Sequence, residues 1–124
     1  MKGYLKSVFT SQKYSLKRLT EYGQNKEPLE FILKDLKDAK IKKGPSILQR
    51  FASFLPFENI SNNDSLGEGN TPIIKANNFL QNKIGHNNIY FKNETQNPTW
   101  SFKDRGSLMC CLLAKEMNEN KIGT

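Results

Sequence analysis

Apolar residues in the first part of the chain recur at helical spacing. Positions i, i+3, i+4 and i+7 are apolar over residues 28–40, and a proline stands in the first turn, so an amphipathic helix is predicted there. Those apolar residues are Leu29, Ile32, Leu33 and Leu36. Gly44 and Pro45 interrupt the pattern, and a second helix is predicted between them and Pro56. Residues 1–60 are therefore expected to be mostly helical.

Shorter elements are predicted in the second half. Residues 59–70 are rich in Asn, Ser, Asp and Gly, which is typical of a loop. A short extended segment is predicted at residues 71–75 and a helix of one or two turns at residues 77–81. After a turn, residues 89–92 alternate between the two faces of an expected strand.

A longer helix is predicted from Ser101 to about Asn118. Ser101 is a good N-cap, and Asp104 three residues later completes a partial capping box. The apolar stripe of this helix consists of Leu108, Met109, Cys111, Leu112, Leu113 and Met117. The strand at 89–92, the turn and this helix follow one another as at the start of a βαβ unit, which predicts an α/β fold.

The charge of the chain is confined to its first part. The net charge is +7, and 16 of the 19 basic residues are lysines. Residues 1–50 carry all of the excess, because basic and acidic residues are equal in number over residues 51–124. A basic leader of this kind can contact nucleic acid or an anionic membrane. The scarcity of arginine favours a solvated lysine-rich face, so no specific nucleic-acid partner and no membrane partner is expected.

Cysteine and histidine usage argues against a metal centre. Cys110 and Cys111 are adjacent, so their side chains diverge on a helix and predict neither a metal pair nor an ordinary disulfide. His86 is the single histidine. The first residues lack the apolar core of a signal peptide, and no apolar run reaches membrane-spanning length. A cytoplasmic protein is expected.

Three dense motifs carry the candidate chemistry. The run Asn97–Gly106, N-P-T-W-S-F-K-D-R-G, places Lys103 at a turn that opens a helix, where a lysine can be desolvated and surrounded by backbone dipoles. The other motifs are Ser65–Pro72, S-L-G-E-G-N-T-P, and Asn88–Glu94, N-I-Y-F-K-N-E. Together they resemble the threonine synthase family, which are pyridoxal-phosphate enzymes of the tryptophan-synthase-β-like superfamily.

The resemblance implies a cofactor and a role for Lys103. In that family the lysine of S-F-K-D-R-G forms a Schiff base with pyridoxal 5'-phosphate, so Lys103 is expected to be catalytic and, with Phe102, to bind the cofactor. Phe102 and Trp100 are expected to shield the amine, and Arg105 and Lys92 to disfavour its charged form. Trp100 stands where many relatives have glycine.

Residues next to the motifs have two interpretations. Asp104 and Arg105 are expected to fix the start of the helix and to pair with the sheet rather than to transfer protons. Glu94, Thr95 and Asn97 follow the strand, where ligands gather in open α/β sheets. They are equally compatible with a polar turn that Asx-type hydrogen bonds hold together.

The resemblance covers the chain from about Pro45 onward. It implies a fold-type II enzyme, with residues 61–124 as the truncated start of the catalytic domain. Residues 1–60, which charge and periodicity predict to be basic and mostly helical, form a separate N-terminal region. Tyr14–Leu16 and Tyr22–Gly23 vaguely resemble a cysteine-bearing ribbon of relatives, without its cysteines. The serine-serine-glycine-asparagine loop and the glycine-rich phosphate loop of relatives do not occur in these residues. The chain is therefore interpreted as the N-terminal portion of such an enzyme.

In the family fold the stripe of the last helix packs on a parallel sheet whose other strands would follow Thr124. Four of its residues are therefore expected to be partly exposed here: Leu108, Leu112, Leu113 and Met117.

The implied reaction converts O-phosphohomoserine, a small-molecule substrate, and water to threonine and phosphate. The resemblance admits a homodimer of the complete enzyme, and the isolated 124-residue chain is expected to be inactive. Alternatives are a non-catalytic remnant of such an enzyme, another fold-type II enzyme such as a threonine dehydratase, and a small basic nucleic-acid-binding protein. The L-G-E-G-N-T-P segment favours threonine synthase.

Overall fold

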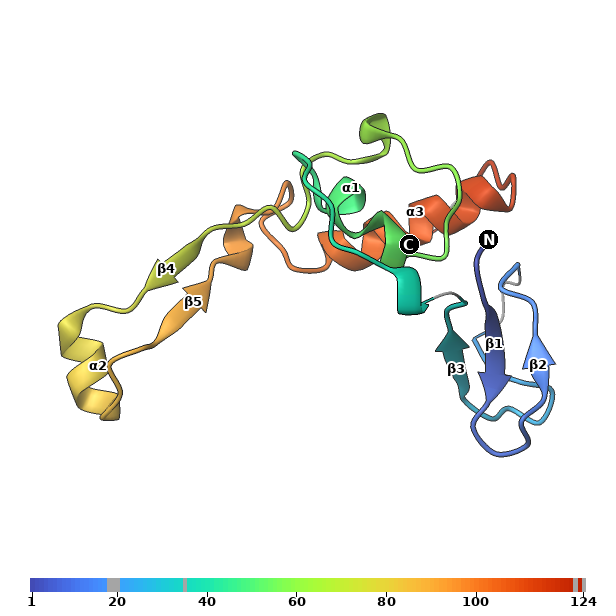
Figure 1. Cartoon of the computed structure of the whole chain (residues 1–124), viewed down its shortest axis with the longest axis horizontal. Helices are drawn as coiled ribbons and strands as arrows, with labels where there is room; N and C mark the ends of the chain where they lie inside the picture. Colours follow the sequence, from blue (N-terminus) through green and yellow to red (C-terminus); the bar gives the residue numbers. More distant parts are fainter. Residues whose placement is uncertain (18–20, 35, 122, 124) are drawn as a thin grey trace.

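The computed structural model describes residues 1–17, 21–34, 36–121 and 123. The molecule is elongated and has three parts in a row, a leader sheet, a central layer of helices and a projecting arm (Figure 1). The leader sheet contains β1, β2 and β3, and the arm contains β4, α2 and β5. The central layer consists of α1 (Ile47–Phe51) and α3 (Asp104–Glu116) with their connecting loops.

The leader forms a sheet where helix was expected. β1 (Tyr4–Ser7) lies between β2 (Lys13–Tyr14) and β3 (Leu29–Ile32) and pairs antiparallel with both. The helix predicted over residues 28–40 is therefore wrong, and only a 3₁₀ turn, η1 (Leu36–Asp38), follows the strand. Residues 29–32 pair with β1 instead of forming a helical turn. This pairing joins residues far apart in sequence, and apolar periodicity along the chain cannot indicate it. Asp35, inside the predicted helix, lies outside the described residues.

A buried carboxylate holds the base of the leader sheet together. Glu27 is 5% exposed and accepts hydrogen bonds from the Tyr14 hydroxyl at 3.0 Å and the Asn25 amide at 2.8 Å. Hydrogen bonds from the backbone are the main cause that lowers the pKa of Glu27 below its usual value. A Cβ at position 23 would overlap this carboxylate, so any residue other than Gly23 would require the Glu27 side chain to shift.

The core lies between α1 and α3. Leu48 is fully buried and packs with Phe57, Leu108 and Leu112. Ser46 caps α1 by accepting a hydrogen bond from the Gln49 amide at 3.2 Å, and a 3₁₀ turn, η2 (Ala52–Phe54), continues the helix toward Pro56. The second predicted helix is thus confirmed.

The stripe of α3 is more buried than expected. Leu108 and Leu112 are buried, so the expectation that they would be exposed is wrong, whereas Leu113 and Met117 are half-buried. Leu48 and Phe57 belong to the same cluster as Leu108 and Leu112. Leu108 and Leu112 are therefore buried by residues of this same chain.

The arm is a two-stranded antiparallel sheet with a helix at its far end (Figure 1). β4 (Ile73–Lys75) pairs with β5 (Tyr90–Lys92), and α2 (Asn78–Ile84) connects them between an Asn77 N-cap and a left-handed Gly85. The predicted strand and short helix are confirmed. Within the described ranges all strand pairs are antiparallel, so the βαβ unit is not confirmed.

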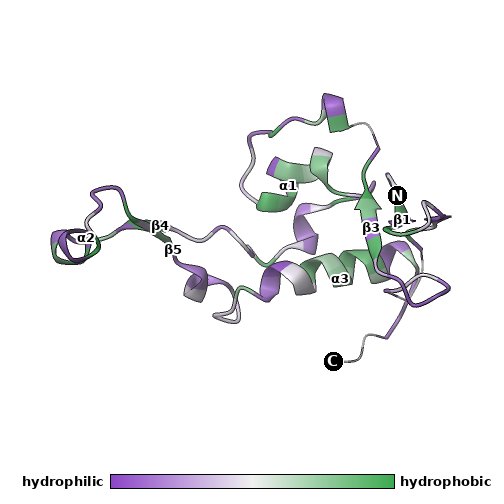
Figure 2. Ribbon diagram, turned by 90° about the horizontal axis from the view of Figure 1, so that it is seen from below, coloured by the Kyte–Doolittle hydropathy of each residue, from purple (hydrophilic) through white to green (hydrophobic). Residues whose placement is uncertain are grey.

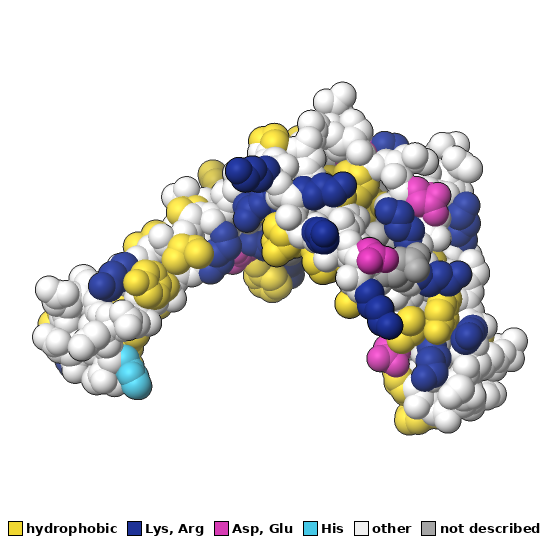
Figure 3. Space-filling model, in the orientation of Figure 1, with side chains coloured by type: hydrophobic (Ala, Val, Ile, Leu, Met, Phe, Trp, Pro, Cys, Tyr) yellow, Lys and Arg dark blue, Asp and Glu magenta, His cyan; other side chains and the backbone are white. Residues whose placement is uncertain are grey.

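Surface properties differ between the parts. Hydrophobic residues of β4 and β5 are exposed along the arm (Figure 2). Lysine and arginine side chains are spread over the face shown in Figure 3 rather than gathered in one patch. Of the helices that the structure describes, none has the length and apolar character needed to cross a membrane.

We expect Leu48→Ala to lower the free energy of unfolding by about 2–5 kcal/mol, because it leaves a cavity at the centre of the core. Urea denaturation followed by circular dichroism measures this loss. The matched control is Leu66→Ala, since Leu66 is 82% exposed and its truncation should change stability by about 0.5 kcal/mol or less. Equal losses in both variants would contradict the described core.

Candidate functional site

Lys103 stands at the N-cap position of α3. The helix begins at Asp104, and the Ser101 hydroxyl accepts a hydrogen bond from the Lys103 amide at 3.2 Å. Ser101, the predicted N-cap, therefore supports the turn from two residues before the observed cap position. In the described part of the chain the Lys103 side chain is exposed and forms no hydrogen bond or ion pair.

The turn that carries Lys103 is held by Asp104. This buried carboxylate accepts a hydrogen bond from the Thr99 amide at 2.8 Å and another from the Thr99 hydroxyl. Asp104 is thus engaged with the turn, in line with the expectation that it fixes the start of the helix.

Trp100 occupies a strained backbone position in the same turn. Its φ is +60°, in the left-handed region that favours glycine, and its amide donates to the Asn97 carbonyl at 2.8 Å. The expected apolar shield is not formed, because Trp100 is 82% exposed and Phe102 is 65% exposed. Each of these side chains points into solvent because the tight turn places it on the surface.

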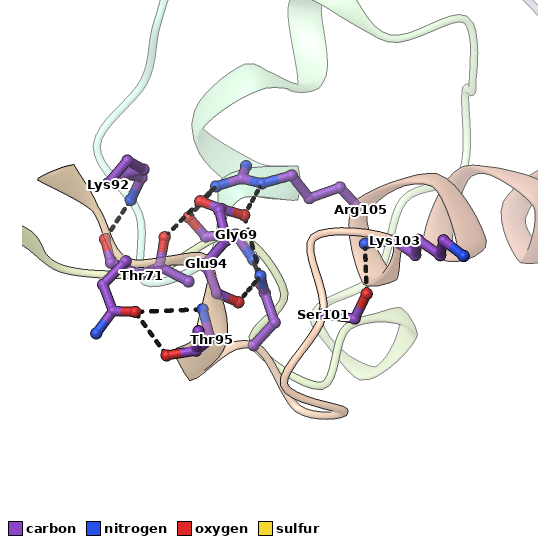
Figure 4. Close-up of polar contacts among 10 residues, drawn as sticks. Gly69, Thr71, Lys92, Glu94, Thr95, Ser101, Lys103 and Arg105 are labelled. Carbon is purple, nitrogen blue, oxygen red and sulfur yellow. Dashed lines mark hydrogen bonds and ion pairs between the residues drawn. The ribbon is translucent and has the colours of Figure 1, made fainter.

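An ion pair joins the strand end to α3. Arg105 donates from Nε to Glu94 at 2.8 Å and from a terminal nitrogen to the other carboxylate oxygen at 2.9 Å (Figure 4). This bidentate contact is the main cause that lowers the pKa of Glu94 from 4.5 to about 2. Arg105 and Lys103 point in different directions from the start of α3, so the expected effect of Arg105 on the lysine charge is not supported.

Asn97 connects this ion pair to the loop that contains Gly67 and Gly69, called the glycine loop below. It is 2% exposed, and its amide nitrogen donates to the Glu94 carbonyl at 2.8 Å and to the Glu94 carboxylate at 3.0 Å. Its side-chain oxygen accepts from the Gly69 amide at 2.8 Å, while the Gly69 carbonyl accepts from Arg105 at 3.1 Å. Gly69 has φ +75°, which favours glycine, and a Cβ at this position would require the Arg105 side chain to shift.

The remaining polar residues extend the cluster toward the arm. The Thr71 hydroxyl donates to Glu94 at 2.8 Å, and the Lys92 ammonium donates to the Thr71 carbonyl (Figure 4). Asn93 accepts from the Thr95 amide at 3.3 Å and from its hydroxyl at 2.6 Å. The strand end is thus a polar turn held by internal hydrogen bonds, the second of the two interpretations given above.

An open cleft of about 500 Å³ lies beside Lys103. One wall is the loop that contains Asp64, Leu66 and Glu68. The floor is one face of α3, with residues at helical spacing: Asp104, Ser107, Leu108 and Cys111. The cleft brings the first two sequence motifs together, and Phe102 does not line it.

Comparison with known proteins bears directly on this arrangement. Residues 65–124, which contain Leu66 and Glu68 of the cleft wall as well as Lys103, match the family described as pyridoxal-phosphate dependent enzyme. The chain is 36% identical over 94 residues to a threonine synthase from Methanocaldococcus jannaschii, covering 76% of this chain and 23% of that protein. The predicted resemblance to threonine synthases is confirmed. Pyridoxal 5'-phosphate, the expected cofactor, is the cofactor of this family.

Two further threonine synthases give the same picture. Those from Bacillus sp. (strain ULM1) and Halalkalibacterium halodurans are each 42% identical over 76 residues, covering 61% of this chain and 21% of their own length. The chain thus spans about a fifth of the curated relatives that it matches. No solved structure matches the chain.

The sequence did not reveal how Gly69, Asn97 and Arg105 meet. Their contacts join segments that are 28 and 36 residues apart. The sequence offered one signal. Each motif contains polar residues that have no obvious hydrogen-bond partner among their neighbours in the sequence. That signal can indicate which residues belong to a polar cluster, but it cannot indicate which of them form hydrogen bonds with one another.

We expect Trp100→Gly to be more stable than Trp100→Ala by about 1 kcal/mol, because alanine retains the cost of the left-handed backbone and glycine does not. Both variants lose the same indole, so the difference between their free energies of unfolding reports the cost of the left-handed backbone conformation at position 100. Urea denaturation of the two proteins measures it. A more stable alanine variant would show that this turn is not strained.

The Glu94 carboxylate should contribute stability that depends on pH. Its folded-state pKa of about 2 lies below the ordinary 4.5, so the contribution is fully present above about pH 4.5 and is lost as the pH falls toward 2. The test is the difference in unfolding free energy between the natural protein and Glu94→Gln, measured from pH 7 to pH 2. Because other carboxylates titrate in both proteins, only the difference reports Glu94. A difference that stays constant down to pH 2 would contradict the ion pair.

Proposed function

We propose that this chain is the N-terminal part of a threonine synthase in which Lys103 is the catalytic lysine. The observation that carries the proposal is that Lys103 faces the same cleft as Leu66 and Glu68, and that all three lie in the segment that matches the pyridoxal-phosphate enzyme family. The names of the similar proteins support threonine synthase over a threonine dehydratase.

The residues around the cleft fit one end of the cofactor. The primary amine of Lys103 suits the aldehyde group, and the nearby hydroxyls of Ser101 and Ser107 can donate hydrogen bonds. The carboxylates of Glu68 and Asp104 in the same cleft do not suit a phosphate dianion. In this proposal Lys103 holds the aldehyde end, with the exposed Phe102 beside it, and the phosphate is bound by other parts of a complete enzyme.

Lys103 also has a task in proton transfer. When bound, the cofactor stabilises negative charge that develops on substrate carbon. The proposed substrate is O-phosphohomoserine, and the Lys103 amine accepts and returns protons at its carbon atoms. Phosphate leaves from the γ-carbon and water adds at the β-carbon. Asp104 and Arg105 have no proton-transfer step in this proposal, since both are engaged in structural contacts.

A chimeric enzyme tests the proposal. Residues 65–124 replace the corresponding segment of the Bacillus sp. threonine synthase, and the chimera is assayed for threonine formation from O-phosphohomoserine. We expect activity in the chimera and a loss of at least about 100-fold on Lys103→Ala, because a positioned proton-transfer group contributes that much or more. Lys75→Ala is the matched control, since Lys75 is an exposed lysine on β4.

Two results would contradict the proposal. One is a folded chimera that retains full activity after Lys103→Ala. The other is a folded chimera that converts a hydroxy-amino acid to a keto acid and forms no threonine, which would favour the dehydratase alternative.

A further inference from the structure

The loop that walls the Lys103 cleft is attached to α3 at both of its ends. At one end Asp64 pairs with Lys115 at 2.7 Å, an exposed contact. At the other end the Gly69 carbonyl accepts from Arg105 at 3.1 Å. The cleft lies between these two attachments, with Lys103 at the Arg105 end.

The Arg105 end is the more strongly built of the two. Arg105 forms a bidentate contact with Glu94, and the nearly inaccessible Asn97 joins Glu94 to the Gly69 amide. Gly69 is therefore held through both its N–H and its C=O. Charge-assisted, bidentate and buried contacts of this kind fix geometry more firmly than an exposed lysine pair does.

These contacts surround the segment that carries Lys103. Asn97 precedes the turn and Arg105 follows it, while Asp104 braces it through Thr99. The Lys103 side chain itself has no hydrogen-bond or ion-pair partner among the described residues. The position of Lys103 relative to the loop across the cleft is thus set by the backbone on either side of it, which these contacts hold in place.

We propose that Arg105, acting through Glu94, Asn97 and Gly69, is a positioning residue that holds the end of the glycine loop against the start of α3 and so places Lys103 opposite the glycine-loop wall. The inference rests on the proposed function, since it assigns a task toward the same lysine. Arg105 does not act by its charge on Lys103, because the guanidinium is paired with Glu94 and points elsewhere (Figure 4).

The test uses the full chain and pyridoxal 5'-phosphate as the probe. Borohydride reduction fixes the aldehyde on each lysine that has condensed with it, and peptide mass mapping gives the labelling of Lys103 relative to the exposed Lys75. We expect a Lys103-to-Lys75 ratio well above one in the natural chain. Arg105→Gln should lower that ratio by about tenfold, less than the roughly 100-fold that a 1 Å misplacement can cost an enzyme.

Two further variants separate positioning from general destabilisation. Arg105→Lys retains the cation and should recover part of the labelling ratio. Asn77→Ala removes the N-cap of α2, which lies at the far end of the arm (Figure 1), and should leave the ratio unchanged although it lowers stability. Circular dichroism and thermal melting establish that each variant is folded.

The outcomes distinguish this inference from the proposed function. A ratio unchanged in folded Arg105→Gln would overturn the positioning role and leave the role of Lys103 intact. A natural chain with no preference for Lys103 would also overturn it, while the chimera assay would still decide the proposed function. A ratio that falls equally in Asn77→Ala would show that destabilisation alone explains the loss.

Discussion

The ion pair between Glu94 and Arg105 is the interaction on which the arrangement of the site depends. It connects the end of β5 to the first turn of α3, and Asn97 extends the same contact to Gly69. Three segments that are separate in sequence thereby share one polar centre. The wall of the Lys103 cleft is attached to that centre through Gly69, and its floor through Arg105 at the start of α3.

Part of this structure could be predicted from local sequence patterns. Proline and glycine placed the helix before Pro56, and the alternation at residues 89–92 marked a strand that the structure contains. Several residues of the lysine motif, which was recognised because it is contiguous in sequence, line the cleft. These features depend on neighbours within a few positions, which a pattern along the chain records well.

Contacts between distant residues account for the failures. The segment L-E-F-I at residues 29–32 had helical apolar spacing, yet Leu29 pairs with Ser7 and Ile32 with Tyr4 in a sheet. Leu108 is covered by the cluster containing Leu48, which no periodicity indicates. Glu94 and Arg105 likewise meet only after the chain has folded. In each case a contact between residues distant in sequence decided the structure, and the local sequence pattern did not indicate that contact.

The arm has a consequence for how the protein behaves in concentrated solution. In the described strands β4 and β5 pair only with each other, and Ile74, Tyr90 and Phe91 on them are exposed. Unpaired strand edges with apolar side chains act as templates for another strand, and a two-stranded sheet alone has little stability. Self-association through this edge is therefore expected to increase with protein concentration.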